Sequence, residues 1–257
     1  MRLICTSDLH GFLPQVPECD LLLIAGDTTP ARGPAAIDPG GFRLDPAGSV
    51  DRQMEWIESD FRPWIEAVPA RETVLIAGNH DFCMQTDEWR DFSQGLPVHY
   101  LEDSGVEIDG LKIWGMPWVS GLRGWAFTRD EPGMAENCRV IPADIDILVS
   151  HGPPRGMLDD VRAAAPLDEH FRKPAPHHVG SEALARRLPW ISPSLFVCGH
   201  IHEDHGLIRA GDSVLANVAC MDVFYDTDHP QAMLRVEIEE STGGLIVLPE
   251  WIRSRPA

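Results

Sequence analysis

The chain has 257 residues, 44% of them hydrophobic, which suits one large α/β domain or two small ones with a substantial core. Its formal net charge is −19, from 40 acidic and 21 basic residues, and this field repels a phosphate backbone at long range. Duplex nucleic acid is therefore not expected as a partner. A small phosphate ester is still compatible with this charge, because bound cations reverse the field locally.

Two further features concern the compartment. No run reaches the roughly 18 to 20 apolar residues of a membrane span, and the N-terminus lacks signal-peptide architecture. We therefore expect a cytoplasmic protein with no membrane partner. The six cysteines form no Cys-x-x-Cys pair, so a disulfide framework is not expected.

The first part of the chain alternates predicted strands with helices. Short apolar runs predict strands over 2–6, 20–25 and 74–77. Residues 30–48 are rich in Pro and Gly and are expected to form a surface loop. Apolar residues at steps of three and four predict a helix over 49–68, with Ser49 or Asp51 as its cap. A short helix is expected over 87–92.

Strands become more frequent in the second part. Alternation around Asp109-Gly110 predicts a hairpin over 106–114, followed by a Trp-rich and Gly-rich loop to 127. A helix over 181–188 is expected to begin at the cap Ser181. Further strands are predicted over 145–149, 195–198, 214–218, 233–238 and 245–248, whereas 157–178 shows no clear periodicity. This order favours a layered α/β sandwich.

Five of these strands end in similar polar residues. The run Val74–Ala77, for example, leads directly into Gly78-Asn79-His80-Asp81. The polar residues at the five strand ends are Asp8, His10, Asp27, Asn79, His80, His151, His200 and His202. Because sites in open α/β sheets gather at the carboxyl ends of strands, we expect these side chains to meet at one edge.

The residue types indicate a metal centre. Two Asp, one Asn and five His offer mixed nitrogen and oxygen ligands, which suit Mn, Fe, Zn, Co or Ni. One ion does not need so many protein ligands, whereas two ions about 3.5–4 Å apart with a bridging carboxylate would use them all. Such a pair neutralises phosphate oxygens, lowers the pKa of a bound water and aligns in-line attack.

Other chemistries lack support in the sequence. There is no Gly-x-Ser-x-Gly for a serine hydrolase and no Gly-x-Gly-x-x-Gly after a strand for dinucleotide binding. His202-Glu203-Asp204-His205 does not match the His-Glu-x-x-His of zinc proteases.

Taken in order, the motifs resemble those of the calcineurin-like metallophosphoesterases. They are Asp8-x-His10, Gly26-Asp27, Gly78-Asn79-His80-Asp81, Ser150-His151 and Gly199-His200-x-His202. Finer features are similar to the metallophosphoesterase-domain (MPPED, fetal-brain 239-type) branch, a class of metallophosphodiesterases. They are Leu101–Ser104, the hairpin leading into Gly115–Trp118, Ser150–Pro154 and His200–Glu203.

The resemblance implies a fold and a set of roles. It implies one domain over 1–257 with a four-layer α/β/β/α sandwich. Asp8, His10 and His202 would hold the first metal, Asp27 would bridge, and Asn79, His151 and His200 would hold the second. His80 would act catalytically beside the phosphate, and a metal-bridging hydroxide would be the nucleophile. The cofactors would be two divalent ions, Mn preferred, with Fe, Zn, Co, Ni or Mg as alternatives.

Three assignments around the substrate are less direct. Asp81 is a candidate catalytic residue that would orient His80. Asn79 and Arg155 are candidate contacts to the substrate, although Arg155 could equally be a solvated surface residue. Trp114, Trp118 and Trp125 could stack a nucleobase or could pack in the core.

We expect a hydrolase for small phosphodiesters such as cyclic nucleotides. A phosphomonoesterase with the same site is the first alternative, and a metal- or nucleotide-binding scaffold with little turnover is the second. Retention of the entire ligand set, with His80 and His200, favours the enzyme.

Overall fold

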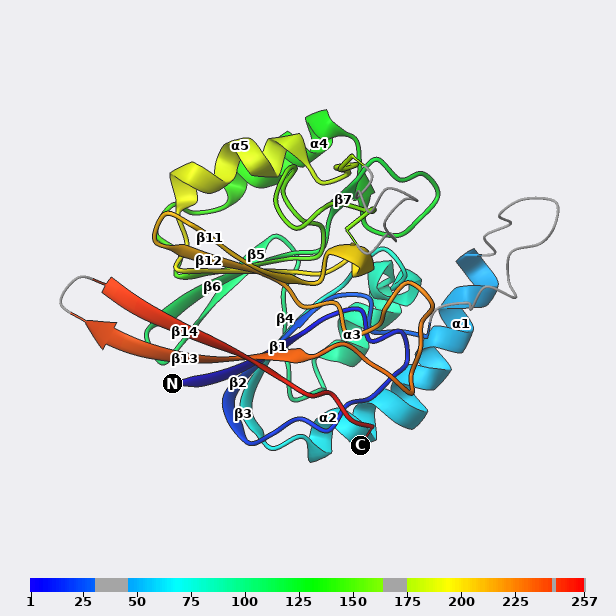
Figure 1. Cartoon of the computed structure of the whole chain (residues 1–257). Helices are drawn as coiled ribbons and strands as arrows, with labels where there is room; N and C mark the ends of the chain where they lie inside the picture. Colours follow the sequence, from blue (N-terminus) through cyan, green and yellow to red (C-terminus); the bar gives the residue numbers. More distant parts are fainter. Residues whose placement is uncertain (31–45, 164–174, 242–243, 257) are drawn as a thin grey trace, which may run out of the picture.

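The computed structural model describes residues 1–30, 46–163, 175–241 and 244–256, and two six-stranded sheets form its centre (Figure 1). The first sheet has the order β14-β13-β1-β2-β3-β4 and the second the order β11-β12-β10-β9-β6-β5. The first contains β1 (Arg2–Thr6), β2 (Cys19–Ala25), β3 (Ala70–Ile76), β4 (His99–Tyr100), β13 (Met233–Ser241) and β14 (Gly244–Ile252). The second contains β5 (Ser104–Ile108), β6 (Leu111–Met116), β9 (Ile147–Ser150), β10 (Leu195–Cys198), β11 (Gly206–Ala210) and β12 (Ser213–Asn217). Two short strands, β7 (Val119–Ser120) and β8 (Thr128–Arg129), pair separately.

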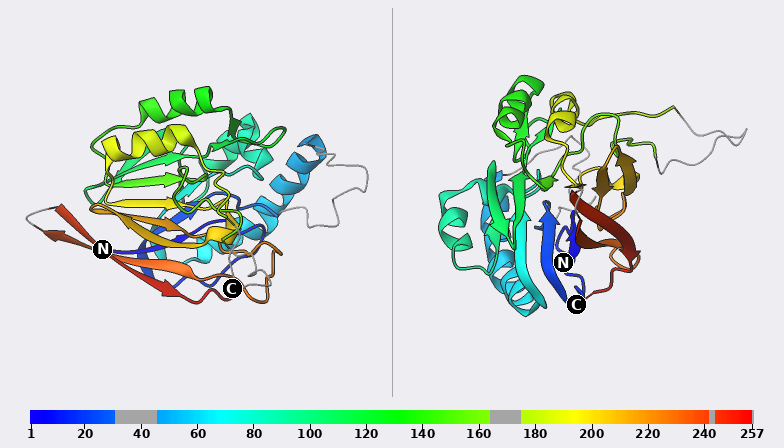
Figure 2. Two further views of the ribbon diagram at one scale, coloured as in Figure 1. Left: turned by 45° about the horizontal axis from the view of Figure 1, so that its top comes forward. Right: turned by 90° about the vertical axis from the view of Figure 1, so that its left-hand side faces the viewer.

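Helices cover the outer faces of both sheets, as the two views of Figure 2 show. On one side lie α4 (Glu131–Val140) and α5 (Glu182–Ile191). Ser181 caps α5 as predicted, because its hydroxyl accepts from Leu184 N. The other side carries α1 (Pro46–Trp56), α2 (Arg62–Ala67) and α3 (Asp87–Ser93). This arrangement confirms the α/β/β/α sandwich.

The central strands are buried on both faces, which explains their unbroken apolar runs. Leu3, Leu23 and Val74 of the first sheet belong to the cluster that includes Val149 and Val197 of the second, so this layer lies between the sheets. The alternate residues of the same strands, such as Ile4, Leu22 and Leu75, belong to a cluster with Ile57 and Phe61 of the helical layer. Period-two alternation thus places each strand in two apolar layers at once.

The predicted helix over 49–68 is longer than expected and irregular. Within the described residues it extends back to Pro46 and includes Ser49 and Asp51, so neither residue is its cap and that part of the prediction is wrong. A wider π-helical turn over Ile57–Phe61 separates α1 from α2. Pro63 falls in the first turn of α2, where a missing N–H costs little, and the helix therefore continues.

Helix α4 and strand β11 were not predicted, and neither were the short strands β4, β7 and β8, of which β7 lies in the predicted loop that ends at 127. Helix α4 begins with Glu131-Pro132-Gly133, whose Pro and Gly suggest a loop, yet Asp130 caps it by accepting from Gly133 N at 2.9 Å. Strand β11 pairs antiparallel with β12. Residues 31–45 of the predicted loop 30–48, and residues 164–174 of the region 157–178, lie outside the described residues. Residues 46–48 belong to α1, so that end of the loop prediction is wrong.

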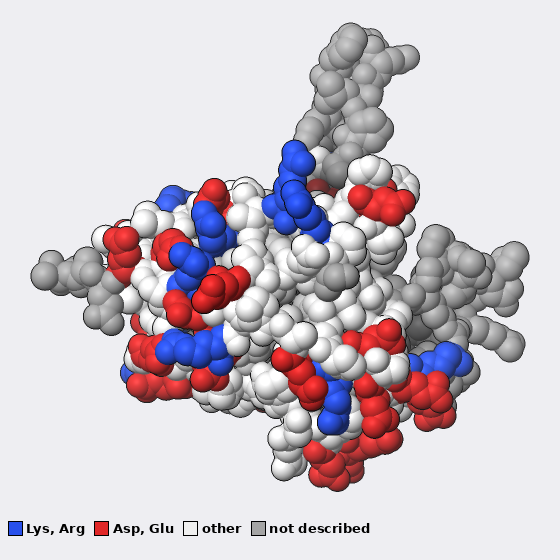
Figure 3. All heavy atoms as spheres, turned by 90° about the horizontal axis from the view of Figure 1, so that it is seen from below, with Lys and Arg blue, Asp and Glu red and all other residues white. Residues whose placement is uncertain are grey.

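Two further features are the charged side chains on the surface and the length of the helices. The face in Figure 3 carries acidic and basic side chains interspersed, with acidic ones prevailing along its lower edge. Among the helices of the described ranges, none is long and apolar enough to cross a bilayer.

Candidate metal centre

The predicted ligands follow the carboxyl ends of parallel neighbouring strands. Strands β1, β2 and β3 lie side by side in parallel, and Asp8, Asp27 and Asn79 follow them in turn. In the second sheet β9 and β10 are also parallel neighbours, and His151 and His200 follow them. Both sheets therefore deliver polar side chains to the same edge of the sandwich.

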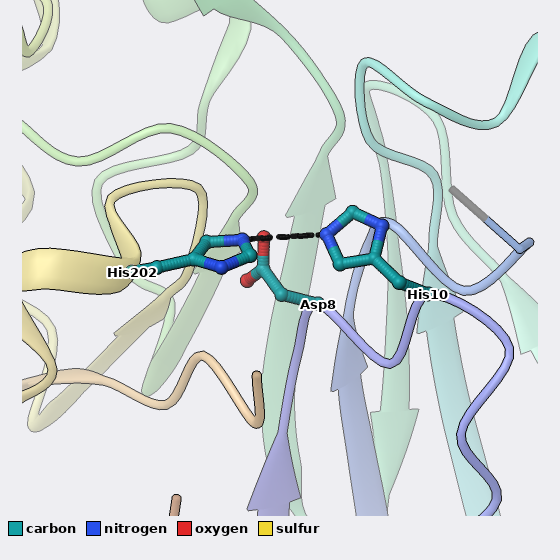
Figure 4. Close-up of side chains that lie close together, drawn as sticks. All are labelled: Asp8, His10 and His202. Atoms are coloured by element: carbon teal, nitrogen blue, oxygen red, sulfur yellow. Dashed lines mark hydrogen bonds and ion pairs between the residues drawn. The ribbon is translucent and has the colours of Figure 1, made fainter. Parts of the chain in front are cut away.

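A first group of candidate ligands consists of Asp8, His10 and His202, whose donor atoms all lie within 4.8 Å of one another. His202 Nε2 is 3.1 Å from Asp8 Oδ1 and 3.3 Å from His10 Nε2. Figure 4 shows the two imidazoles facing each other across the Asp8 carboxylate. These are the residues that the sequence assigned to one metal.

A second group consists of Asp27, His151 and His200, again within 4.8 Å. His151 Nε2 is 3.2 Å from Asp27 Oδ2 and 3.1 Å from Asn79 Oδ1, so Asn79 joins this group. Asp27 also lies within the same limit of His10 and His80. Its carboxylate therefore stands between the two groups, as a bridging ligand would.

The hydrogen bonds at the outer ring nitrogens test whether a metal fits. His151 Nδ1 is 2.8 Å from the carbonyl of Ala25, and His202 Nδ1 is 2.9 Å from that of Asp222. Each Nδ1 therefore donates, and in the neutral ring each Nε2 presents a lone pair inward. The His151 lone pair would face the oxygens of Asn79 and Asp27, which repel it unless a cation lies between them. The donor set fits divalent metal ions.

The pKa shifts reflect the same convergence of charge. Burial lowers the pKa of His10 and of His200 to about 3, which leaves both rings neutral. Burial also opposes charge on His151 and His202, but Asp27 and Asp8 outweigh it and raise the pKa of each histidine to about 9. Without metal, a proton on each of these two rings thus takes the place of a cation.

The backbone is strained where the ligands converge. Asp8, His10, Asp27 and His200 adopt φ values of 52°, 45°, 51° and 69°, in the left-handed region that side chains other than glycine rarely occupy. Glycine allows the close approach of the chain. A Cβ on Gly199 would lie 2.0 Å from Asp8 Oδ2, and one on Gly78 would lie 2.3 Å from Asp27 Oδ1.

His80 lies beside both groups. Its N–H donates to Asp27 Oδ1 at 2.7 Å, and its ring packs edge-on against His10 with centroids 4.7 Å apart. Burial lowers the pKa of His80, although Asp27 opposes the shift. Gln53 of α1 fixes the main chain here, since Nε2 donates to His80 O at 2.7 Å and Oε1 accepts from Cys83 N at 2.9 Å.

Asp81 is fully buried and contacts the backbone rather than the His80 ring. Its carboxylate accepts from the N–H groups of Gly78, Thr28 and Thr29 and from the Thr29 hydroxyl. Burial and Asp27 raise its pKa to about 6, although those hydrogen bonds oppose the shift. Within the described residues Asp81 therefore joins the loops after β2 and β3, and it can orient His80 only through them.

A comparison with family models decides the family. The model described as calcineurin-like phosphoesterase matches residues 1–204. The chain belongs to the calcineurin-like phosphoesterase family. It is accordingly a hydrolase, a metallophosphoesterase, in a metal-dependent family.

Relatives and solved structures agree with this result. "Metallophosphoesterase domain-containing protein 1" of Homo sapiens is 26% identical over 260 residues, covering 91% of this chain and 70% of that protein. A UPF0046 protein of Caenorhabditis elegans is 28% identical over 236 residues, covering 85% of this chain and 69% of that protein. One crystal structure aligns with a TM-score of 0.63 at 13% identity, over 97% of this chain and 98% of that chain, which shows a shared fold.

Arg155 is a candidate that this phosphoesterase does not bring to the metal groups. The residue is exposed, and its guanidinium donates to His178 O at 2.9 Å. No hydrogen bond or ion pair joins it to a predicted ligand in the described part of the chain. Its contact with substrate stays a prediction.

The tryptophans differ in position. Trp118 is buried, donates its indole N–H to Asp103 at 2.6 Å, and carries the Arg129 guanidinium over its ring. Trp125, by contrast, lies with its ring centroid 4.5 Å from that of His80. Trp118 is thus largely buried, although it lines a cavity together with His200, and Trp125 lies against His80.

Tyr225 was missed by sequence reasoning. Its ring lies 4.7 Å from that of His10 and 5.2 Å from that of His202, measured between centroids. Burial raises the pKa of Tyr225, and Asp27, Asp8 and Glu203 raise it further. It sits in an irregular loop after β12 with no motif around it, so the sequence gives no signal for it.

Proposed function

We propose that this phosphoesterase is a phosphodiesterase that hydrolyses small phosphodiesters, such as cyclic nucleotides, at a dinuclear metal centre. The observation that carries the proposal is the pair of ligand groups with Asp27 between them and His80 beside them. Asp8, His10 and His202 would hold one ion, and Asn79, His151 and His200 the other, with Asp27 shared.

The ions would supply the positive charge that the acidic protein lacks. When bound, they would neutralise phosphate oxygens and provide a hydroxide at neutral pH, with Mn our preferred metal. The surrounding residues prepare the site for them. The carbonyls of Ala25 and Asp222 orient the rings of His151 and His202.

His80 contributes the main side-chain chemistry. Its imidazole faces the site without being needed as a ligand by either group, and 18% of its side chain is exposed. It would donate a hydrogen bond to a phosphoryl oxygen or protonate the leaving oxygen. Asp27 accepts a hydrogen bond from the His80 backbone N–H, so the candidate bridging ligand would also hold the His80 main chain beside the ions.

One residue, Trp125, supports the proposal that the ester carries a planar organic group. The Trp125 ring lies 4.5 Å from that of His80 and 6.2 Å from that of Phe82, between centroids, so an ester bound beside His80 would come near it. A base or an aryl group could stack there. Trp125→Ala should raise KM for a nucleotide diester several-fold, while Trp190→Ala, on an exposed residue of α5, should not.

The experiment compares an aryl phosphodiester with the monoester of the same leaving group. Protein stripped of metal and reloaded with Mn is assayed beside His80→Ala and beside His99→Ala, a partly exposed histidine that pairs with Glu72. We expect diester turnover that needs metal and that falls about 100-fold or more in His80→Ala alone.

Three other results of this assay would change the proposal. A preference for the monoester would keep the site and replace the substrate class with phosphomonoesters. Turnover of neither ester by protein holding two metals would contradict the proposal in favour of a binding scaffold. Full activity in His80→Ala would remove the catalytic role of that residue.

A further inference from the structure

Tyr225 lies over the first ligand group although no motif contains it. Its ring meets that of His10 at 67° and that of His202 at 58°, with centroids 4.7 Å and 5.2 Å apart. Both histidines belong to the group with Asp8. The phenol therefore borders the position where a substrate would meet this group.

The loop that carries Tyr225 is tied to the same group. The carbonyl of Asp222 accepts from His202 Nδ1 at 2.9 Å and from Tyr225 N at 3.1 Å. The Asp222 carboxylate accepts from the N–H groups of Phe224 and Asp226 at 2.9 and 3.1 Å. One residue thus orients the ligand and positions the tyrosine.

The conformation of Tyr225 is strained. Its φ of 56° lies in the left-handed region, which is unusual for an aromatic residue and persists only where the surroundings enforce it. The neighbouring Phe224 is 79% exposed, so the loop does not adopt this shape in order to bury apolar surface there. The shape instead directs the Tyr225 ring onto His10.

The hydroxyl of Tyr225 has no partner in the described part of the chain. No hydrogen bond joins it to a residue there, and it is not one of the fully buried polar atoms that lack a partner. The Tyr100 hydroxyl, by comparison, lies 3.5 Å from Glu102 Oε2. The first group offers carboxylate and imidazole acceptors, so an O–H beside it supplies the donor that a phosphate oxygen needs.

We propose that Tyr225 is a substrate-positioning residue, whose hydroxyl donates a hydrogen bond to a non-bridging phosphoryl oxygen at the first ligand group. This inference rests on the proposed function and adds a contact that the motifs do not contain. A hydrogen bond to a charged oxygen changes affinity by roughly 10- to 100-fold.

The test uses Tyr225→Phe, which keeps the ring and removes only the hydroxyl. Tyr100→Phe is the matched control, since the chain has 2 tyrosines. Each Mn-loaded protein is analysed for bound metal, titrated with inorganic phosphate by calorimetry, and assayed with the aryl diester. We expect Tyr225→Phe to retain its metal, to bind phosphate about tenfold or more weakly, and to lose about 10- to 100-fold in kcat/KM.

Two results would overturn the inference. Phosphate affinity and kcat/KM like those of the wild type would show that the hydroxyl touches no substrate. Loss of metal from Tyr225→Phe would show that it acts through His10 and His202 instead.

The two proposals can fail separately. Wild-type protein that binds phosphate but cleaves no ester contradicts the proposed function, while the phosphate titration still decides the role of Tyr225. Wild-type protein that cleaves the diester but binds no phosphate keeps the proposed function, and kcat/KM of Tyr225→Phe then decides the role of the hydroxyl. Tyr225→Ala, which also removes the ring from His10, should lower metal affinity in addition.

Discussion

At the residue scale, glycines directly precede three of the predicted ligands. Gly26, Gly78 and Gly199 stand before Asp27, Asn79 and His200. The structure gives the physical reason, because a side chain on Gly199 would occupy the space of the Asp8 carboxylate. A repeated Gly-Asp, Gly-Asn or Gly-His after a strand is therefore a packing requirement of the centre as well as a family motif.

Gly199→Ala tests this requirement. Its Cβ would lie 2.0 Å from Asp8 Oδ2 and 2.1 Å from Ser7 Oγ, so Asp8 must move. We expect overpacking to destabilise the protein by about 1–3 kcal/mol and metal affinity to fall at least tenfold. Thermal unfolding and metal titration provide the two readouts.

Gly95→Ala serves as its control, because the nearest atom to the added Cβ is Phe92 O at 3.5 Å. It should leave metal affinity unchanged. Equal metal binding in Gly199→Ala and wild type would show that Asp8 is not held as close as described.

Residue types and spacing made most of the candidate site predictable. All eight polar residues at the strand ends lie in the metal groups or beside them. Tyr225, Gln53 and Asp222 could not be predicted, because tertiary packing alone brings them to the site. Asp81 shows the same limit, since the sequence placed it next to His80 but could not show that its carboxylate binds backbone amides.

At the element scale, strand ends were more predictable than helix ends. Continuous apolar runs identify strands buried on both faces, and β1 and β10 match their predicted ranges. Helix α4 was missed because Pro132 and Gly133 occupy its first turn. The start of α1 was misplaced because Pro46 begins a helix within a Pro-rich stretch.

Helix α1 acts on the site through Gln53. The side chain is buried and joins His80 O to Cys83 N. Gln53→Ala leaves the Cys83 N–H without this partner, which should cost about 1–3 kcal/mol of stability. We expect kcat to fall about tenfold with metal content unchanged, because the His80 backbone loses a support.

Gln94→Ala removes an exposed glutamine that donates to Arg90 O, and it should change neither quantity. Loss of bound metal in Gln53→Ala would contradict this account, because it would place the effect of α1 on the ligands instead of on His80.

At the scale of the whole molecule, metal ions and protons compete for the same histidine rings at one edge of the sandwich. Without metal, the pKa values of His151 and His202 are raised to about 9 by the carboxylates of Asp27 and Asp8, against the opposing effect of burial. An unfolded histidine titrates near 6.5. Between these values His151 and His202 hold more protons in the folded protein than in the unfolded chain, so their contribution to stability falls as pH rises. His10 and His200 oppose this only near pH 6.5, because unfolded histidines lose their protons above it.

We therefore expect the Tm of metal-free protein to drop by about 5 °C or more between pH 6.5 and 8.5. The pKa values of Asp8 and Asp27 are lowered, so their contribution is already complete above pH 5 and does not vary in this window. With excess divalent metal the Tm should instead rise with pH, because metal replaces the two protons. A flat Tm in chelator would contradict the assignment of the protons to these rings.

The central claim is that two adjacent ions share Asp27, and the metal content of the chain tests it most directly. Stripped protein is equilibrated with Mn, freed of unbound metal and analysed, beside Asp27→Ala and the exposed-surface control Asp144→Ala. We predict two Mn per chain in wild type and control, and one or none in Asp27→Ala. A single Mn in the wild type, or two in Asp27→Ala, would contradict the shared centre.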